Sequence, residues 1–167
     1  AVGYELHKQF GAAGTRELDD KAFVIAASYK LGKVDIGAAY NEQQYEIGAG
    51  SELKKTAWMI GADWSLAGPH SVGANYTQAD STKGSGPAPA AISASTVPFN
   101  AAGNTGANLF QIYYGHKFSK RTTAKLGYVR LDNDLNAAYT LGGVKTSAVA
   151  ANNKDQNALV LLLKHKF

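Results

Sequence analysis

The sequence contains no cysteine and no long hydrophobic run. The absence of cysteine excludes a disulfide framework and any metal site built from thiolates. The longest apolar run, residues 158–163, is far shorter than the roughly 18 residues that a membrane-spanning helix needs. Such a chain can cross a membrane only as a closed β-barrel, because lipid leaves unpaired backbone groups without a partner.

Charge is sparse and evenly spread. The chain has 17 Lys and Arg against 13 Asp and Glu, a net charge of +4 over 167 residues. Without a basic cluster, nucleic acid is not an expected partner. The length suits one domain over residues 1–167. The start also lacks a basic stretch followed by an apolar one, so we expect any signal peptide to lie upstream or to have been removed.

Alternation of apolar and polar residues is the main positive signal. Segments of about ten residues, the length of tilted membrane strands, show it repeatedly. They are 1–10, 21–31, 33–45, 55–66, 71–80, 107–118, 122–132 and 156–167. The short connections are 32–33, 67–70 and 119–121, and they alternate with longer ones at 11–20, 46–54, 81–106 and 133–155. Short turns at one end and long loops at the other are typical of outer-membrane barrels.

The apolar faces carry aromatic residues near the strand ends. In 55–66, Trp58 and Trp64 lie near opposite ends of one apolar face, as two interfacial aromatic girdles require. In 156–167, Leu159, Leu161 and Phe167 share one face, while lysines share the other. We predict as interfacial aromatics Tyr40, Trp58, Trp64, Phe118, Tyr128 and Phe167.

A soluble antiparallel barrel or sandwich would alternate in the same way, but it would bury the apolar face. Alternation alone does not distinguish the two. The aromatic residues at strand ends, the unequal connections and the terminal Phe167 favour the membrane barrel. The predicted fold class is therefore all-β, an antiparallel transmembrane β-barrel with eight strands in this chain.

The polar faces then line the interior, where charges set ion selectivity. The pore-lining candidates are Glu5, His7, Lys30, Asp35, Asn41, Asp63, Gln111, Lys117, Lys125, Lys164 and Lys166. Lysine outnumbers the acidic residues in this set, which predicts a mild preference for anions.

The sequence offers little support for a catalytic site or a metal site. His7, His70, His116 and His165 are far apart in sequence and show no paired ligand spacing, so no metal site is expected. We place His70 in a turn. No serine lies in a nucleophile-elbow context. The prediction is a protein that is not an enzyme and needs no cofactor. The Gly, Pro, Ala and Ser-rich segment 81–106 is expected to be a mobile surface loop or, alternatively, a plug folded into the lumen.

Two stretches resemble the general diffusion porins of Gram-negative bacteria, in particular the betaproteobacterial and neisserial type. One is YYGHKFSKRTTAKLGYVRLDND at 113–134, whose turn at 118–122 is similar to that family's penultimate hairpin. The other is the ending LLLKHKF. The resemblance implies an outer-membrane homotrimer that passes ions and small hydrophilic solutes, embedded in lipid and lipopolysaccharide. It also implies that Phe167 is recognised by the barrel-assembly machinery.

Members of that family have sixteen strands, so the resemblance implies that this chain is the C-terminal half of a barrel, with the constriction loop upstream. The alternative is a self-closed eight-stranded barrel that acts as an anchor or binds partners through its loops. Eight strands close, but their side chains nearly fill the interior, whereas sixteen leave an aqueous channel. The apolar face with Leu159, Leu161 and Leu163 would suit lipid or a neighbouring subunit equally well.

Overall fold

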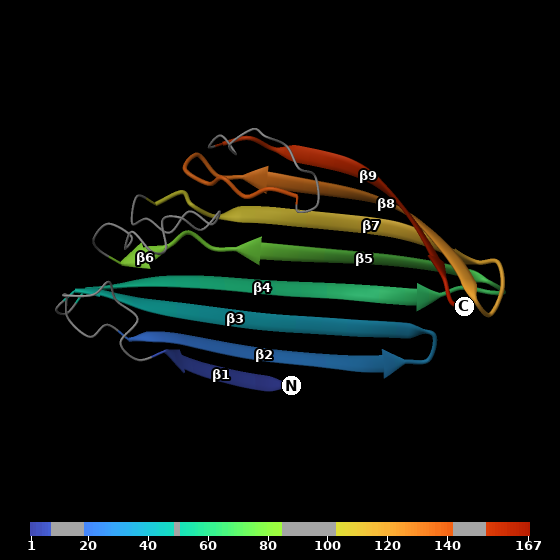
Figure 1. Cartoon of the computed structure of the whole chain (residues 1–167), viewed down its shortest axis with the longest axis horizontal. Coiled ribbons are helices and arrows are strands. Elements are labelled where there is room, and N and C mark those ends of the chain that lie inside the picture. Colours follow the sequence, from blue (N-terminus) through green and yellow to red (C-terminus); the bar gives the residue numbers. More distant parts are fainter. Residues whose placement is uncertain (8–18, 49–50, 85–102, 142–152) are drawn as a thin grey trace.

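The computed structural model describes residues 1–7, 19–48, 51–84, 103–141 and 153–167, and the regular structure in these residues is β-sheet (Figure 1). The strands are β1 (Val2–His7), β2 (Asp20–Leu31), β3 (Val34–Gly48), β4 (Ser51–Ser65), β5 (His70–Ala79), β6 (Lys83–Gly84), β7 (Ala107–Lys117), β8 (Thr122–Asn133) and β9 (Gln156–His165).

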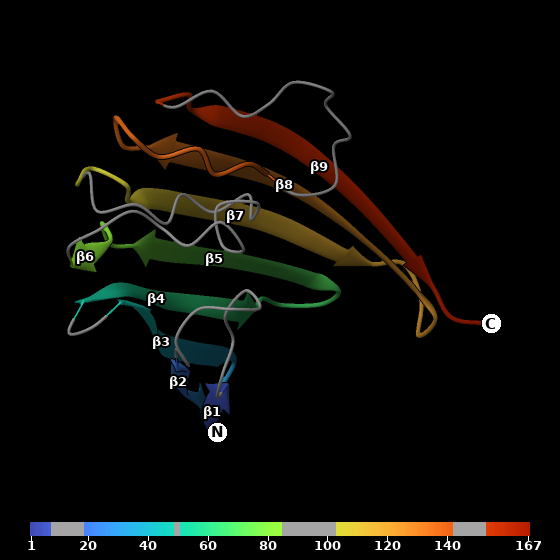
Figure 2. The ribbon, with the colours of Figure 1, turned by 60° about the vertical axis from the view of Figure 1, so that its left-hand side comes forward.

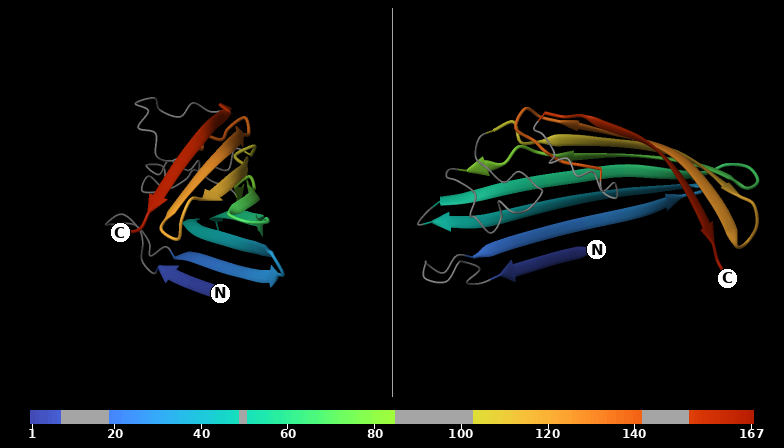
Figure 3. Two further views of the ribbon diagram at one scale, coloured as in Figure 1. Left: turned by 90° about the vertical axis from the view of Figure 1, so that its right-hand side faces the viewer. Right: turned by 45° about the horizontal axis from the view of Figure 1, so that its top comes forward.

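One antiparallel sheet contains all of these strands. Its order is β1-β2-β3-β4-β5-β7-β8-β9, and the two-residue β6 pairs separately with β4. Each long strand therefore lies beside its neighbour in sequence, and the sheet twists so that β9 runs obliquely to β4 (Figure 2). Viewed end-on, the sheet is an open arc with β1 and β9 at its edges (Figure 3). An all-β antiparallel fold with eight long strands is confirmed, whereas the described strands do not close into a barrel.

The two ends of the sheet differ in the connections between their strands. At one end, here called the turn end, residues 32–33, 66–69 and 118–121 join successive strands. Backbone geometry explains the tightness of the first two, since Gly32 has φ +60° and Gly68 has φ +68°, values that suit glycine. The opposite end is here called the loop end. The connecting ranges 8–18, 49–50, 85–102 and 142–152 lie outside the described residues.

The sequence prediction was wrong for the connection 46–54. Strands β3 and β4 both continue into it, with Tyr45 opposite Leu53 and Glu46 opposite Glu52. Alternation fades there because the outward residues become polar, but a backbone ladder needs only its N–H and C=O groups. An ion pair between Lys54 Nζ and Glu42 Oε1, 2.7 Å long, links the two strands in this extension.

Three smaller predictions also need correction. His70 is the first residue of β5 rather than part of a turn. The last strand ends at His165, so Lys166 and Phe167 lie beyond it, although the Lys166 N–H still donates to the Arg121 carbonyl at 2.9 Å. Strand β6 was not predicted at all. Of the predicted strand 1–10, residues 8–10 lie outside the described residues.

The two faces of the sheet differ in what they expose. We call the face bearing Asp63, Tyr113 and Lys125 the inner face, and the opposite one the outer face. The outer face exposes large apolar side chains along its whole length, including Leu159 at 78%, Leu161 at 76% and Tyr29 at 70%. A soluble sheet would cover such a face.

A small core is confined to the loop end of the inner face. Its buried apolar residues are Leu53, Ala107, Val129, Leu131 and Ala137. Residues 103–106 and 134–141 leave the strands here and fold against this part of the inner face. Gly106 makes the close approach possible, because its amide donates to Asp134 Oδ2 at 3.2 Å while its carbonyl accepts from the Asp134 amide at 3.0 Å.

Replacing Gly106 by alanine is expected to destabilise the fold by about 1–3 kcal/mol, the usual cost of overpacking. The new methyl group would stand 2.7 Å from the Ala79 carbonyl oxygen, which the ladder between β5 and β7 holds in place. The midpoint of urea unfolding, followed by heat-modifiable mobility in gel electrophoresis, measures the change. Gly37→Ala is the control, since its nearest atom lies 3.9 Å away. Equal losses in both variants would contradict this account.

Candidate functional site

The inner face gathers most of the polar residues singled out in the sequence. Their backbone pairings place nine of the eleven candidates on this face: Glu5, Lys30, Asp35, Asn41, Asp63, Gln111, Lys117, Lys125 and Lys164. The backbone of His7 pairs with Asp20, while its side chain lies outside what the structure describes. Lys166, the eleventh, follows the end of β9.

Acidic residues lie on the inner face of the strands that come first in the chain. Asp35 on β3 stands directly opposite Asp63 on β4, and Glu5 lies on the same face of β1. Like charges in register repel each other. Lys30 relieves part of this repulsion, because its Nζ lies 3.2 Å from Asp35 Oδ2.

Basic residues lie on the inner face of the last strands. Lys117 on β7 and Lys164 on β9 both pair in register with Thr123, and Lys125 follows two positions along β8. Apart from the paired Lys30, the charges predicted for this face are thus divided, with acids on β1, β3 and β4 and lysines on β7, β8 and β9.

The ring of Tyr113 lies between the two charged groups. Register places Tyr113 between Gly73 on β5 and Gly127 on β8. A Cβ on Gly73 would come within 2.5 Å of the ring, so the ring lies over this glycine. The Lys125 ammonium lies over the ring, 4.0 Å from its centroid, which is a cation–π contact. Tyr113 was not among the predicted site residues. The feature that could have identified it is a glycine opposite it on each neighbouring strand, and this can be recognised only once the register between strands is known.

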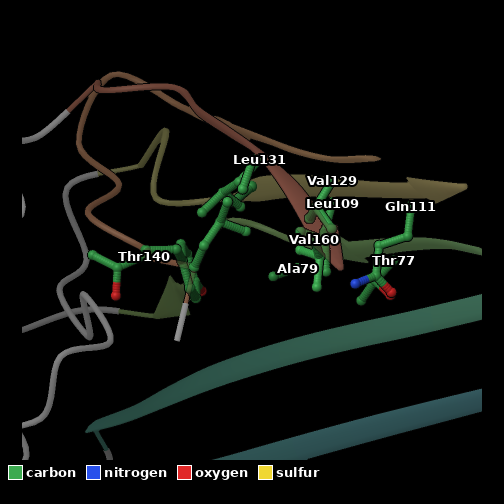
Figure 4. A pocket seen from close by; sticks show the side chains of 12 residues that line it. Thr77, Ala79, Leu109, Gln111, Val129, Leu131, Thr140 and Val160 are labelled. Atoms are coloured by element: carbon green, nitrogen blue, oxygen red, sulfur yellow. The ribbon is translucent and has the colours of Figure 1, made fainter. Parts of the chain in front are cut away.

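An apolar cavity occupies the loop end of the same face, which the sequence predicted to be polar. It has a volume of about 460 Å³, and its aliphatic lining includes Leu109, Leu131 and Val160, with Thr77 and Gln111 at one side (Figure 4). Leu141 and Tyr139 reach it from the segment 134–141. Because that segment partly covers the cavity, this stretch of the face behaves as a small core rather than as a wetted surface.

Asn133 holds the covering segment in place. Its side-chain amide donates to the carbonyls of Tyr139 at 3.0 Å and Lys154 at 2.7 Å, and its oxygen accepts from the Tyr139 amide at 2.9 Å. The sequence indicated only that a loop begins near this residue. Its buried position follows from the chain returning over the sheet.

Two further polar groups are buried beside it. The Lys55 ammonium donates to the Thr105 carbonyl at 2.8 Å and lies 5.3 Å from the Tyr139 ring centroid. Burial raises the pKa of Tyr139 to about 12, with a smaller contribution from Asp134. The phenol therefore stays neutral at physiological pH. Lys55 and Tyr139 extend the functional face beyond the residues that the sequence indicated.

The outer face carries the aromatic residues in two bands. Toward the loop end, Tyr40 pairs with Trp58, whose ring packs 5.5 Å from that of Tyr76. Tyr128 follows on β8, opposite Leu159. Trp64 and Phe118 lie at the turn end, and Phe167 extends beyond β9 with its ring fully exposed, 4.9 Å from that of His165. All six predicted aromatic residues thus lie outside the inner face.

Membrane-spanning helices and clusters of metal-binding side chains can be assessed only in the part of the chain that the structure describes. Within these residues no helix is long and apolar enough to cross a membrane. Nor do three or more His, Asp or Glu side chains gather there in a way that could hold a metal ion. The sequence suggested that His70 and His116 lie far apart. Register instead places them side by side on β5 and β7.

Comparison with known proteins identifies relatives of this sheet. A family model described as Gram-negative porin matches residues 1–137. The chain is similar in structure to the anion-selective porin from Comamonas acidovorans, with a TM-score of 0.74 and 21% identity over 99% of this chain and 44% of that one. It is also similar to OmpT of Vibrio cholerae in its trimer form, with a TM-score of 0.62 and 15% identity over 99% and 51% of the two chains. No curated protein matches in sequence. The chain thus spans about half the length of the solved structures that it matches.

Replacing Asn133 by alanine is expected to release the segment 134–141 from the sheet. The variant loses three hydrogen bonds and leaves buried backbone groups without partners, at a cost of about 1–3 kcal/mol. Hydrogen exchange at the Tyr139 amide should therefore accelerate. Asn157→Ala, on the exposed outer face of β9, is the matched control and should leave this exchange unchanged. Unaltered exchange in Asn133→Ala would refute the anchoring role.

Proposed function

The chain belongs to the Gram-negative porin family, and we propose that it forms part of the wall of a water-filled channel in the bacterial outer membrane. Ions and small hydrophilic solutes would cross this channel by passive diffusion. Such transport involves no turnover and needs neither a catalytic group nor a cofactor.

The observation that carries the proposal is the distribution of side chains between the faces. Charged and amide groups collect on the inner face, whereas the outer face exposes Leu159, Leu161 and Leu163 in one row of β9. Burying one such side chain contributes about 1.5–3 kcal/mol. Lipid around the outer face would cover the leucines, and water along the inner face would solvate the charged and amide groups.

The aromatic bands support the same orientation. Trp58 and Trp64 lie six residues apart on β4, which is about 20 Å along a strand at roughly 3.3 Å per residue. This spacing approaches the height of the apolar band on outer-membrane barrels, about 25 Å. We propose that Tyr40, Trp58 and Tyr128 line one interface, and that Trp64, Phe118 and Phe167 line the other.

The channel that we propose has more strands than the described sheet. Strands β1 and β9 are the edges of an open arc, and the matched solved structures are about twice as long as this chain. An exposed edge presents unpaired N–H and C=O groups that lipid cannot satisfy. A barrel of about sixteen strands would pair both edges and leave room for an aqueous pore.

Partners follow from the family as further proposals. The homotrimer that we propose would bury part of the outer face against neighbouring subunits, and outer-membrane lipid and lipopolysaccharide would cover the rest. One matched relative, OmpT, is a trimer in its solved form. We also propose that the barrel-assembly machinery recognises Phe167, which is exposed and lies beyond the last strand.

Selectivity would follow from the charges of the inner face. Lys117, Lys125 and Lys164 form the basic group on the last strands, and among the acids Asp35 is already paired with Lys30. We propose a mild anion preference for this part of the wall. The relative from Comamonas acidovorans is described as anion-selective, which agrees in direction.

The orientation can be tested on adjacent residues of β9. Leu161→Arg places a charge on the outer face and should cost about 2–4 kcal/mol if this site lies in the bilayer midplane. Val160→Arg places the same charge on the inner face, where Val160 lines the cavity but is 46% exposed, so the charge should stay in contact with water and be tolerated. Folding yield into lipid vesicles, measured by heat-modifiable mobility, compares the two. The reverse order would show that the faces are assigned wrongly.

Conductance and selectivity test the channel itself. In planar bilayers, the complete barrel of about sixteen strands that we propose should conduct and show a reversal potential on the anion side in a tenfold KCl gradient. Lys125→Glu combined with Lys164→Glu should shift the permeability ratio toward cations, on the order of a few-fold. Lys125→Glu alone and Lys21→Glu, an equal charge change on the outer face, form the matched control pair. Absence of conductance would instead favour a closed barrel with an anchoring role.

A further inference from the structure

Two histidines from different strands meet on the outer face at the turn end. His70 begins β5 and His116 lies near the end of β7, and the two stand directly opposite each other in register. Their Nδ1 atoms are 3.3 Å apart, with the ring centroids separated by 4.9 Å. A cross-strand pair of this kind is held by the backbone ladder, so the strands set the spacing of the two nitrogens.

A third donor atom reaches the same point. The Tyr114 hydroxyl contacts His70 Nδ1, so that His70 Nδ1 has both Tyr114 and His116 as neighbours. A neutral imidazole nitrogen has one lone pair in the ring plane and accepts one hydrogen bond well. Two neighbours therefore compete for a single acceptor. A cation placed among the three atoms would remove the competition, because each atom would direct a lone pair at it.

The spacing also suits such a cation. In a tetrahedral site with metal–nitrogen bonds of about 2.0–2.1 Å, two ligand nitrogens lie roughly 3.3–3.4 Å apart. We propose that His70 and His116, with the Tyr114 hydroxyl as a third donor, bind a divalent transition-metal ion of the zinc, copper or nickel class. Imidazole is a preferred ligand of these three ions, whereas calcium and magnesium prefer oxygen. Water would complete the coordination.

The position of the site permits access from water. His70 follows the exposed turn 66–69, and both histidines are partly exposed, while Tyr114 is 43% exposed. The ion would therefore enter from the aqueous side of the turn end. Once bound, it would cross-link β5 and β7 on the outer face, independently of any channel on the inner face.

His165 provides an internal control. It lies on the same face at the same end of the sheet, but its Nδ1 is 2.8 Å from the Thr122 hydroxyl and its ring packs on Phe167. A hydrogen-bonded interfacial histidine of this kind offers one nitrogen and no neighbouring ligand. If His70 and His116 were also only interfacial residues, all three histidines would respond alike to metal.

Titration with Zn²⁺ alone, on the chain folded in detergent micelles, tests the proposal. We expect one equivalent of Zn²⁺ to bind. His70→Gln or His116→Gln should weaken binding by about tenfold or more, because loss of residues that only hydrogen-bond to metal ligands already lowers metal affinity by about that factor. His165→Gln should bind like the unmodified chain. Heat-modifiable mobility confirms that each variant is folded.

Cu²⁺ supplies a readout that does not depend on affinity. Its electron paramagnetic resonance spectrum should show coupling to two imidazole nitrogens in the unmodified chain and to one in His116→Gln. Tyr114→Phe should weaken Zn²⁺ binding less than either histidine variant. Absence of Zn²⁺ binding, or equal binding after loss of His70 or His116 in folded protein, would overturn the proposal.

Discussion

The continuous antiparallel ladder from β1 to β9 is the constraint on which the other features depend. Every long strand pairs with its sequence neighbour, so the strands between the edge strands β1 and β9 satisfy their backbone N–H and C=O groups on both sides without help from water. Within this ladder, side chains must alternate between two faces. One pattern therefore places the charges on the inner face and the exposed leucines on the outer face. The chain belongs to the Gram-negative porins, and in the outer-membrane channel that we propose lipid would cover the leucines while water reaches the charges.

The ladder also explains why this sheet has so little conventional core. Most of its large apolar side chains face outward, and the buried ones, such as Leu53 and Leu131, lie where loop segments fold back at the loop end. Polar groups do much of the anchoring there: Asn133 binds the segment 134–141 through three hydrogen bonds, and Lys55 binds Thr105. The inner face thus differs along the strands. Charges such as Asp63 and Lys125 lie toward the turn end, whereas the apolar cavity and the buried Lys55 lie toward the loop end.

Much of this architecture could be predicted from sequence because alternation is local. Trp58 and Trp64 share a face whatever the neighbouring strands do, and the same holds for the lysines of β9. Strand ends were harder to predict. The extension of β3 and β4 through 46–54 was missed because polar side chains conceal a ladder that depends on the backbone. The cavity was missed for a different reason, since Leu109 and Val160 occupy positions that alternation assigns to a polar face.

By itself, then, the sequence determined the class of fold and which side chains share a face, because a period of two is a property of each strand alone. Only the tertiary structure decided which residues meet across strands. Tyr113 lies over Gly73 and contacts Lys125, and His70 faces His116, because the register between strands brings them together. Register is set by the turns and by the pairing of whole strands. Residues 46 positions apart can therefore form one site that no local pattern reveals.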